Sequence, residues 1–80
     1  MDIITQYAID HYIKPARARG DYVVGIMSGD IHKALNMKNA LPTVCSKLGS
    51  NVFQKEAKVK RIALEGPTNG AKALFVFRLK

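Results

Sequence analysis

Two runs of alternating apolar residues stand on either side of GPTNG, residues 66–70, and this arrangement constrains the fold more than any other part of the sequence. GPTNG is dense in residues that favour turns. KVKRIALE before it, residues 58–65, and AKALFVFRL after it, residues 71–79, have the period of two that predicts a β-strand. A short connection, in which Phe53 is expected to anchor to the core, leads into the first strand, where Ile62 and Leu64 are expected on one face. In the second strand, one set of side chains alternates with the other: Ala73, Phe75, Phe77 and Leu79 against Leu74, Val76 and Arg78.

The predicted hairpin belongs to a chain of 80 residues with one cysteine, Cys45. This length predicts one small domain over residues 1–80, and a single cysteine closes no internal disulfide. A lone thiol is typical of a reducing, intracellular setting, so we expect a cytoplasmic protein. The longest apolar runs are only a few residues, so neither a membrane span nor a signal peptide is predicted.

The N-terminal part of the chain predicts a helix followed by a short strand. DIITQYAIDHYI, residues 2–13, carries apolar residues at helical spacing along one face. The helix is expected to end near Ile13, because the residue before Pro15 disfavours helical geometry, and ARARGD is expected to be a basic loop. YVVGIM, residues 22–27, predicts a strand in which Gly25 marks a bulge or a close backbone approach.

Residues 28–50, SGDIHKALNMKNALPTVCSKLGS, predict two short helices joined by a polar turn. Ser28 is expected to cap the first helix, which runs from about residue 29 to 35. Its apolar residues Ile31, Ala34 and Leu35 recur at helical spacing and are expected to face the core. In the joint, Asn36 and Asn39 are the residue type that best tolerates a left-handed backbone outside glycine.

The second helix of the pair is expected from Ala40 to Leu48, with Pro42 in its first turn. Asn39 is expected to cap it, and Gly49 to end it through a positive φ. One face carries the apolar stripe Leu41, Val44, Cys45 and Leu48. The other face carries the small polar or basic side chains Thr43, Ser46 and Lys47, continued by Ser50 and Asn51. Such side chains read base edges and bind phosphates.

Positive charge is concentrated in the middle of the chain. The sequence has 13 Lys and Arg residues against 6 Asp and Glu, a formal net charge of +7, and seven of the cations but only one of the anions lie in residues 33–61. An excess of this kind favours an acidic partner, and its position on the predicted helix and hairpin favours nucleic acid.

The order of helix, short strand, helix, turn, helix and hairpin resembles a winged helix-turn-helix domain over nearly the whole chain. The resemblance implies a small α+β fold with a three-helix core, a C-terminal hairpin wing at residues 66–72 and a short additional strand. It implies binding to double-stranded DNA, as a transcriptional regulator or DNA-associated factor, through the helix at 40–48 and the basic hairpin at 58–72. The residues implied to contact nucleic acid are Lys38, Asn39, Thr43, Ser46, Lys47, Ser50, Asn51, Lys58, Lys60, Arg61 and Lys72.

Other classes of function fit the residues less well. Cys45 with His32 or His11 would supply a nucleophile and a base, but Cys45 lies on an apolar stripe, so we expect a buried thiol and no enzyme. One cysteine and two histidines match no zinc pattern, and no cofactor is predicted. The alternative is a winged-helix module that binds an acidic partner protein. An exposed part of LFVF, residues 74–77, would support a homodimer.

Overall fold

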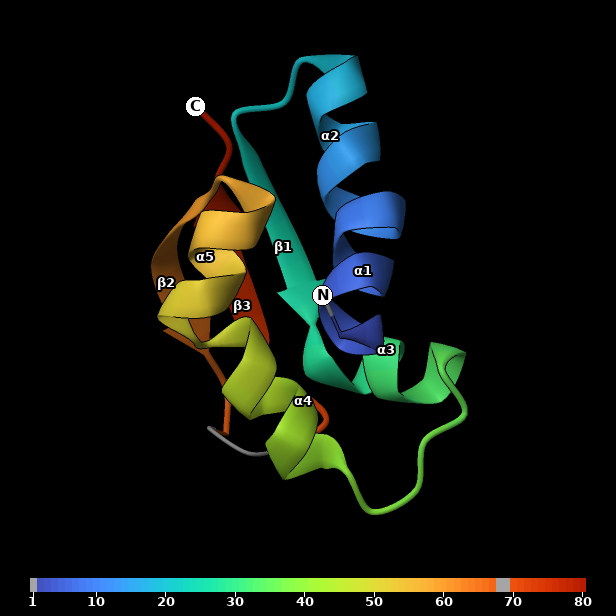
Figure 1. Cartoon of the computed structure of the whole chain (residues 1–80). Coiled ribbons are helices and arrows are strands. Elements are labelled where there is room, and N and C mark those ends of the chain that lie inside the picture. The colour runs from blue at the N-terminus through green and yellow to red at the C-terminus, as the bar shows by residue number, and fades with distance from the viewer. Residues whose placement is uncertain (1, 68–69) are drawn as a thin grey trace.

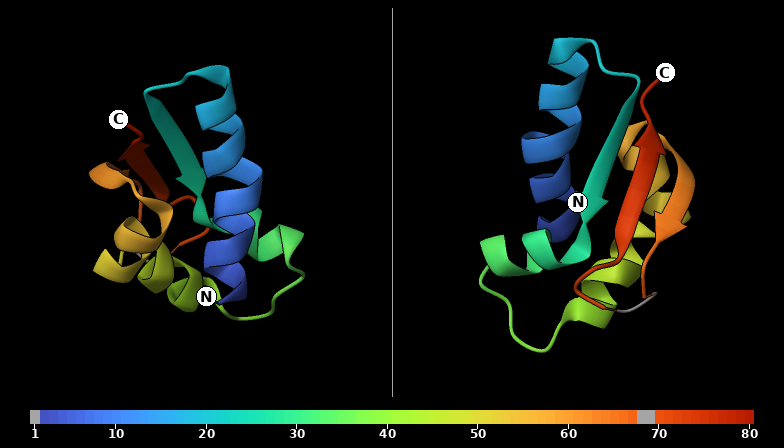
Figure 2. Two further views of the ribbon diagram at one scale, coloured as in Figure 1. Left: turned by 45° about the horizontal axis from the view of Figure 1, so that its top comes forward. Right: turned by 180° about the vertical axis from the view of Figure 1, so that it is seen from behind.

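A computed structural model describes residues 2–67 and 70–80 and places helices on one face of a three-stranded sheet (Figures 1 and 2). The elements follow one another in the order α1 Ile3–Ala8, the π-helix η1 Ile9–Ile13, α2 Lys14–Arg19, β1 Val23–Met27, α3 Ser28–Ala34, α4 Leu41–Leu48, α5 Asn51–Ala57, β2 Lys60–Glu65 and β3 Leu74–Arg78. The predicted α+β class is confirmed. Within the described ranges, no helix is both long enough and apolar enough to cross a membrane.

The N-terminal helix is longer than predicted, because α1, η1 and α2 form one continuous helical rod (Figure 1). In a regular α-helix Pro15 would clash with the carbonyl four residues earlier and would leave one hydrogen bond unmade. The wider π-helical turn lies directly before it, and there Lys14 N–H donates to the carbonyl of Ile9. The expected end near Ile13 is therefore wrong. The expected basic loop instead forms α2, which ends at Gly20 with a φ of 82°.

The sheet is antiparallel with β3 at its centre, in the order β1-β3-β2. The register between β1 and β3 is uninterrupted, so Gly25 does not form a bulge. It is a position of close approach instead, since a Cβ added there would lie 3.3 Å from Leu74 Cδ1. The helices cover only one face of this sheet, as the view from behind in Figure 2 shows.

The bulge in this sheet lies in β2. Consecutive residues of β3 pair with Arg61 and Ala63, so Ile62 between them has no cross-strand partner. The extra residue breaks the alternation that was expected to place Ile62 and Leu64 on one face. Both side chains are exposed, and β2 is an edge strand with no buried residue.

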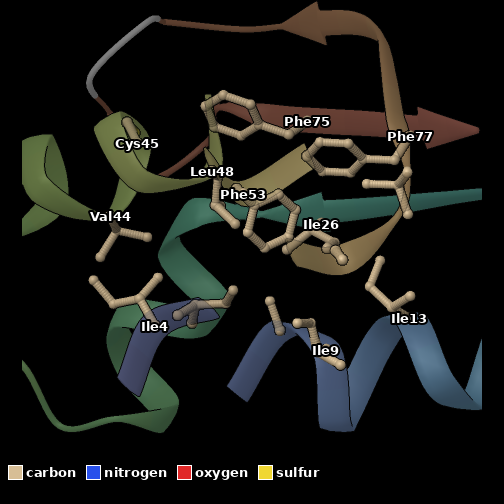
Figure 3. Close-up of a cluster of buried hydrophobic side chains, with 14 of the residues drawn as sticks. Ile4, Ile9, Ile13, Ile26, Val44, Cys45, Leu48, Phe53, Phe75 and Phe77 are labelled. Carbon is tan, nitrogen blue, oxygen red and sulfur yellow. The ribbon is translucent and has the colours of Figure 1, made fainter. Parts of the chain in front are cut away.

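The core lies between the sheet and the helices (Figure 3). The rings of Phe53 and Phe77 are tilted against each other with their centroids 5.1 Å apart. The alternation predicted for residues 71–79 is confirmed, because Ala73, Phe75, Phe77 and Leu79 are buried whereas Leu74, Val76 and Arg78 are not. The side chains labelled in Figure 3 come from the helices and from two strands: Ile4, Ile9, Ile13, Ile26, Val44, Cys45, Leu48, Phe53, Phe75 and Phe77.

The start of α3 is tied to the hairpin. Ser28 is buried inside the first turn, and its Oγ donates to the carbonyl of Gly70 at 2.6 Å. The Ser28 and Gly29 N–H groups donate to the carbonyls of Ala73 and Ala71 at 3.0 and 2.9 Å. The expected capping role of Ser28 is therefore wrong, because its hydroxyl binds a carbonyl from a distant part of the chain.

The buried face of α3 is narrower than its sequence predicts. Ile31 is fully buried and Leu35 is partly buried, as expected. Ala34 is exposed, in contrast to the prediction, because the short helix packs only along the side that carries Ser28 and Ile31. This helix contributes one large side chain to the core.

The segment after α4 is a further helix, α5, where a short connection was expected. Ser50 Oγ accepts a hydrogen bond from Phe53 N–H at 3.1 Å and so caps the helix. Phe53, predicted to anchor this segment, is buried. The helix ends at Lys58, which has a φ of 57°, and Arg17 Nη1 donates to the carbonyl of Ala57 at 3.0 Å. The rod and α5 are thereby joined.

Gly49 separates α4 from α5 for a reason other than the predicted one. Its φ is −85°, so no left-handed conformation requires glycine here. A Cβ at this position would lie 3.1 Å from Arg61 Nη1 and 3.2 Å from the carbonyl oxygen of Cys45. Lack of space therefore favours glycine where α4, α5 and β2 meet.

Candidate nucleic-acid interface

The outer face of α4 has the composition that the sequence predicts. Pro42 lies in the first turn, and the inward side chains of Val44, Cys45 and Leu48 are buried against the core. The opposite side exposes Thr43, Ser46 and Lys47. The helix therefore presents two hydroxyl groups and one ammonium group to the solvent.

The joint between α3 and α4 brings two more of the predicted residues next to this face. Asn36 and Asn39 have φ values of 53° and 52°, which confirms the predicted left-handed positions. Asn39 does not cap α4, because the cap residue is Ala40, whose N–H donates to His32 Nε2 at 3.3 Å. Lys38 and Asn39 are exposed at the start of the helix.

Ser50 and Asn51 have local roles in the structure. The hydroxyl of Ser50 donates to the carbonyl of Lys47 at 2.7 Å while it caps α5, so its hydrogen-bonding capacity is largely used. Asn51 is exposed, and its Oδ1 accepts a hydrogen bond from Gln54 Nε2 at 3.3 Å. These two residues shape the turn after α4 more than they extend its outer face.

Lys47, on this face, has an acidic neighbour. Its Nζ lies 3.7 Å from Oδ2 of Asp2, and both side chains are partly exposed. Asp2 also caps α1, since Oδ1 accepts from Thr5 N–H at 2.9 Å and Oδ2 from Thr5 Oγ1 at 3.0 Å. Desolvation acts to raise the pKa of Asp2, but the hydrogen bonds from Thr5 and the charge of Lys47 lower it below its usual value. The carboxylate therefore stays ionised and offsets part of the positive charge of Lys47.

Arg61 is committed to the junction of the helices. Its Nη1 donates to the carbonyl of Gly49 at 2.8 Å, and its N–H donates to Gln54 Oε1 at 3.0 Å. Its cross-strand partner is Phe77, so it projects toward the helices rather than away from them. The guanidinium group thereby satisfies a carbonyl at the end of α4.

We expect Arg61→Ala to destabilise the fold by about 0.5 to 1.5 kcal/mol, because the substitution removes the hydrogen bond to the Gly49 carbonyl. The midpoint of urea denaturation measures the loss. Lys60→Ala, one residue earlier and exposed, is the control and should change stability by less than about 0.5 kcal/mol. Equal stability of the two variants would contradict a structural role for Arg61.

Lys58 and Lys60 lie far from the outer face of α4. They precede or begin β2, at the end of the molecule that holds the C-terminus and the end of α2, whereas α4 and the joint lie at the opposite end (Figures 1 and 2). Lys60 pairs with Arg78 across the sheet, on the face that the helices leave uncovered. The structure therefore separates these two lysines from the α4 side chains with which the sequence grouped them.

The segment that leads into β3, residues 70–73, lies beside α4, and we call it the return limb of the hairpin. Cys45 Sγ and the carbonyl oxygen of Gly70 are 3.7 Å apart, and the hydrogen bonds of Ala71 and Ala73 to α3 hold this limb in place. Lys72 is exposed on it. Thr68 and Asn69, in the predicted wing, lie outside the described residues.

Six of the predicted residues lie on the joint, on α4 and on the return limb, and these three segments are at the same end of the molecule (Figure 1). We call them the α4 surface: Lys38, Asn39, Thr43, Ser46, Lys47 and Lys72. Neither Lys38 nor Lys72 forms an ion pair with any residue that the structure describes. The α4 surface combines small hydrogen-bonding groups with net positive charge, a chemistry that suits phosphate and base edges.

The expected burial of Cys45 is confirmed. Cys45 is a buried free thiol within the core. Over residues 2–67 and 70–80, no group of three or more histidine, cysteine or acidic side chains is close enough to hold a metal ion. His11 stacks on Tyr7 with ring centroids 4.2 Å apart, on a different element from Cys45.

Sequence reasoning missed a second basic group near the C-terminus. Arg78 lies opposite Lys60, and Lys80 Nζ lies 4.7 Å from the ring centroid of Tyr22. The alternation of β3 could have predicted the outward position of Arg78, because it places Arg78 and the buried Phe77 on different faces of the sheet. Its pairing with Lys60 depends on the bulge in β2, which the sequence does not reveal.

Comparison with protein-family models, with curated proteins and with solved structures finds no match to this chain.

Proposed function

We propose that this chain is a winged-helix protein that binds double-stranded DNA through the α4 surface. The observation that carries the proposal is that Lys38, Lys47 and Lys72 are exposed on three segments that lie at the same end of the molecule as the exposed hydroxyl groups of α4. Phosphate groups would contact the lysines, and the hydroxyl side chains would meet base edges in a groove.

The topology supports the winged-helix part of this proposal. A hairpin follows the last helix, and the strand between the first two helical segments pairs with its second strand in the order β1-β3-β2. In a winged helix the hairpin and the reading helix approach DNA from the same side. Cys45 on α4 contacts Gly70 on the return limb, so the hairpin and α4 are neighbours, as the proposal requires.

The charge distribution supports duplex DNA as the ligand. The chain carries a net charge of +7, and only Lys14, Arg19 and Lys47 form ion pairs within the described ranges. Cations without acidic neighbours keep their full charge for a polyanion and release its counterions on binding. A role as a transcriptional regulator or DNA-associated factor follows from this binding.

Removal of the negative charge beside Lys47 should strengthen DNA binding. Asn caps helices about as well as Asp, so Asp2→Asn is expected to retain α1 while it frees Lys47 for a phosphate. We expect an affinity about 3- to 10-fold higher at low salt, measured by fluorescence anisotropy with a labelled duplex. Asp10→Asn removes the same charge from the N-terminal rod, where the carboxylate pairs with Lys14, and should leave the affinity within about 2-fold. Weaker binding by Asp2→Asn would contradict the proposal.

A chemical-shift map of the labelled chain, titrated with a random-sequence duplex, tests ligand class and binding face together. The amides of Thr43, Ser46, Lys47 and Lys72 are expected to shift with added duplex. Shifts confined to the sheet would assign the binding to another face. An absence of shifts at low salt would overturn the proposal and would favour an acidic protein partner.

A further inference from the structure

The helices leave one face of the sheet uncovered (Figure 2). The side chains on this face form a regular pattern. The cross-strand register arranges its outward side chains in three rows, each crossing β1, β3 and β2. We call this the outer sheet face, and its rows are Met27, Leu74 and Glu65; Gly25, Val76 and Ala63; and Val23, Arg78 and Lys60.

The centre of the outer sheet face is apolar although no element covers it. An antiparallel sheet with one face in water usually places polar residues on that face. Here the central strand directs Leu74 and Val76 outward, and Val23 is 46% exposed at one side. Gly25, which has no side chain, and Ala63, which has a single methyl group, flank Val76 in the middle row. This composition is typical of a sheet that packs against another sheet.

The charges of this face lie at its two ends and have opposite signs. Glu65 ends the first row, whereas Arg78 and Lys60 occupy the third row at the other end of the strands. None of the three forms an ion pair with another described residue. Like charges directly opposite each other, as in Arg78 and Lys60, destabilise a sheet unless a negative charge lies nearby.

We infer that the outer sheet face binds the same face of a second copy of this chain. The two copies are related by a two-fold axis that lies between their faces and runs parallel to the middle row. This axis reverses the strand direction of one copy relative to the other. The rotation brings Val76 against Val76 of the second copy, and it brings Glu65 against Lys60 of the second copy at both ends. The face is therefore complementary to itself, both in its apolar centre and in its charges.

The size of the face sets the strength of this dimer. Three strands of five residues span about 17 by 14 Å, which lies at the small end of specific protein interfaces. A dissociation constant on the order of micromolar or weaker is therefore expected. The dimer leaves the α4 surface free, because that surface lies on other elements, and it does not depend on DNA binding.

Sedimentation equilibrium of the full chain, from about 10 µM to about 1 mM, tests the inference. A reversible monomer–dimer equilibrium is expected, and Val76→Glu should raise the dissociation constant at least 10-fold. Val76 lies on the central strand and not on the edge strand β2. Loss of the dimer in this variant would therefore indicate packing of the two faces rather than pairing of the exposed β2 edges. A chain that is monomeric throughout, or a dimer that Val76→Glu leaves intact, would overturn the inference. Circular dichroism confirms that the variant is folded.

A charge exchange gives a second, independent test. Lys60→Glu and Glu65→Lys should each weaken the dimer, because each places like charges together at both ends. The double variant restores both pairs and should recover the wild-type dissociation constant. A mixture of the two single variants should form a heterodimer, since Glu65 of one then meets Lys60 of the other while the two introduced charges also pair. Lys55→Glu, on α5, is the control for a change in net charge. Failure of both the double variant and the mixture to recover would contradict the arrangement.

Discussion

Replacement of Phe77 by alanine is expected to destabilise the fold by about 3 to 5 kcal/mol. Phe77 is fully buried on the central strand, and its ring packs against that of Phe53 across the space between the sheet and α5. A small domain has a total unfolding free energy of about 5 to 15 kcal/mol, so the variant would lose much of its stability.

Urea denaturation of Phe77→Ala measures this loss, and Tyr22→Ala is the matched control. Tyr22 is an aromatic residue beside the same sheet but is 67% exposed, so its truncation should cost less than about 1 kcal/mol. The two variants separate the effect of burial from the effect of aromatic side-chain loss. A loss below about 1 kcal/mol for Phe77→Ala would mean that the core is not built around the two rings.

Simultaneous replacement of Lys38, Lys47 and Lys72 by alanine is expected to lower the affinity for duplex DNA by about 500-fold near 0.1 M salt. Each lysine that neutralises a phosphate releases condensed counterions, and at this salt concentration each such contact contributes close to 10-fold. All three side chains are exposed, so the thermal midpoint of the variant should stay within a few degrees of that of the wild-type chain.

The control removes the same positive charge from the rest of the surface. Lys14, Arg19 and Lys80 lie in α2 and at the C-terminus, away from the α4 surface. Their joint replacement by alanine should lower the affinity by less than about 10-fold, through the long-range field alone. Equal losses in the two triple variants would show that net charge, rather than the α4 surface, determines binding.

Features that depend on one local pattern were predictable from the sequence. The period of two around GPTNG predicted the hairpin and the two alternating sets of side chains in β3, because burial on one face of a strand imposes that period. The helical stripe of Val44, Cys45 and Leu48 gave both the burial of α4 and the outward direction of Thr43, Ser46 and Lys47. The two left-handed asparagines of the joint followed from side-chain type alone.

Features that depend on a distant partner were not predictable in this way. The hydroxyl of Ser28 binds Gly70, which lies 42 residues later, so its local pattern wrongly indicated a cap. A π-helical turn accommodates Pro15, and the presence of that proline does not by itself predict the turn. The helix α5 did have a local signal, the Ser50 cap followed by Phe53 and Ala57 at a spacing of four, but the segment was interpreted as a connection.

The residues of the candidate site also fall into two groups, those that a local pattern could place and those that it could not. Lys47 could be placed from the helical period, and the structure places it on the outer face of α4. Lys60 and Arg61 are neighbours in the sequence, but the strand directs one to the outer sheet face and the other to the carbonyl of Gly49. Adjacent residues of a strand point to opposite faces, so the strand itself separates them, and a count of charges over residues 33–61 does not reveal this.

Titration of a labelled random-sequence duplex at about 50 mM and about 200 mM salt tests the central claim, that the α4 surface binds DNA, most directly. If its three lysines each neutralise one phosphate, the affinity should fall about 40-fold between the two conditions, and the Lys38, Lys47 and Lys72 variant should lose most of that salt dependence. Absence of binding at the lower salt concentration, or a salt dependence that the variant retains in full, would contradict it.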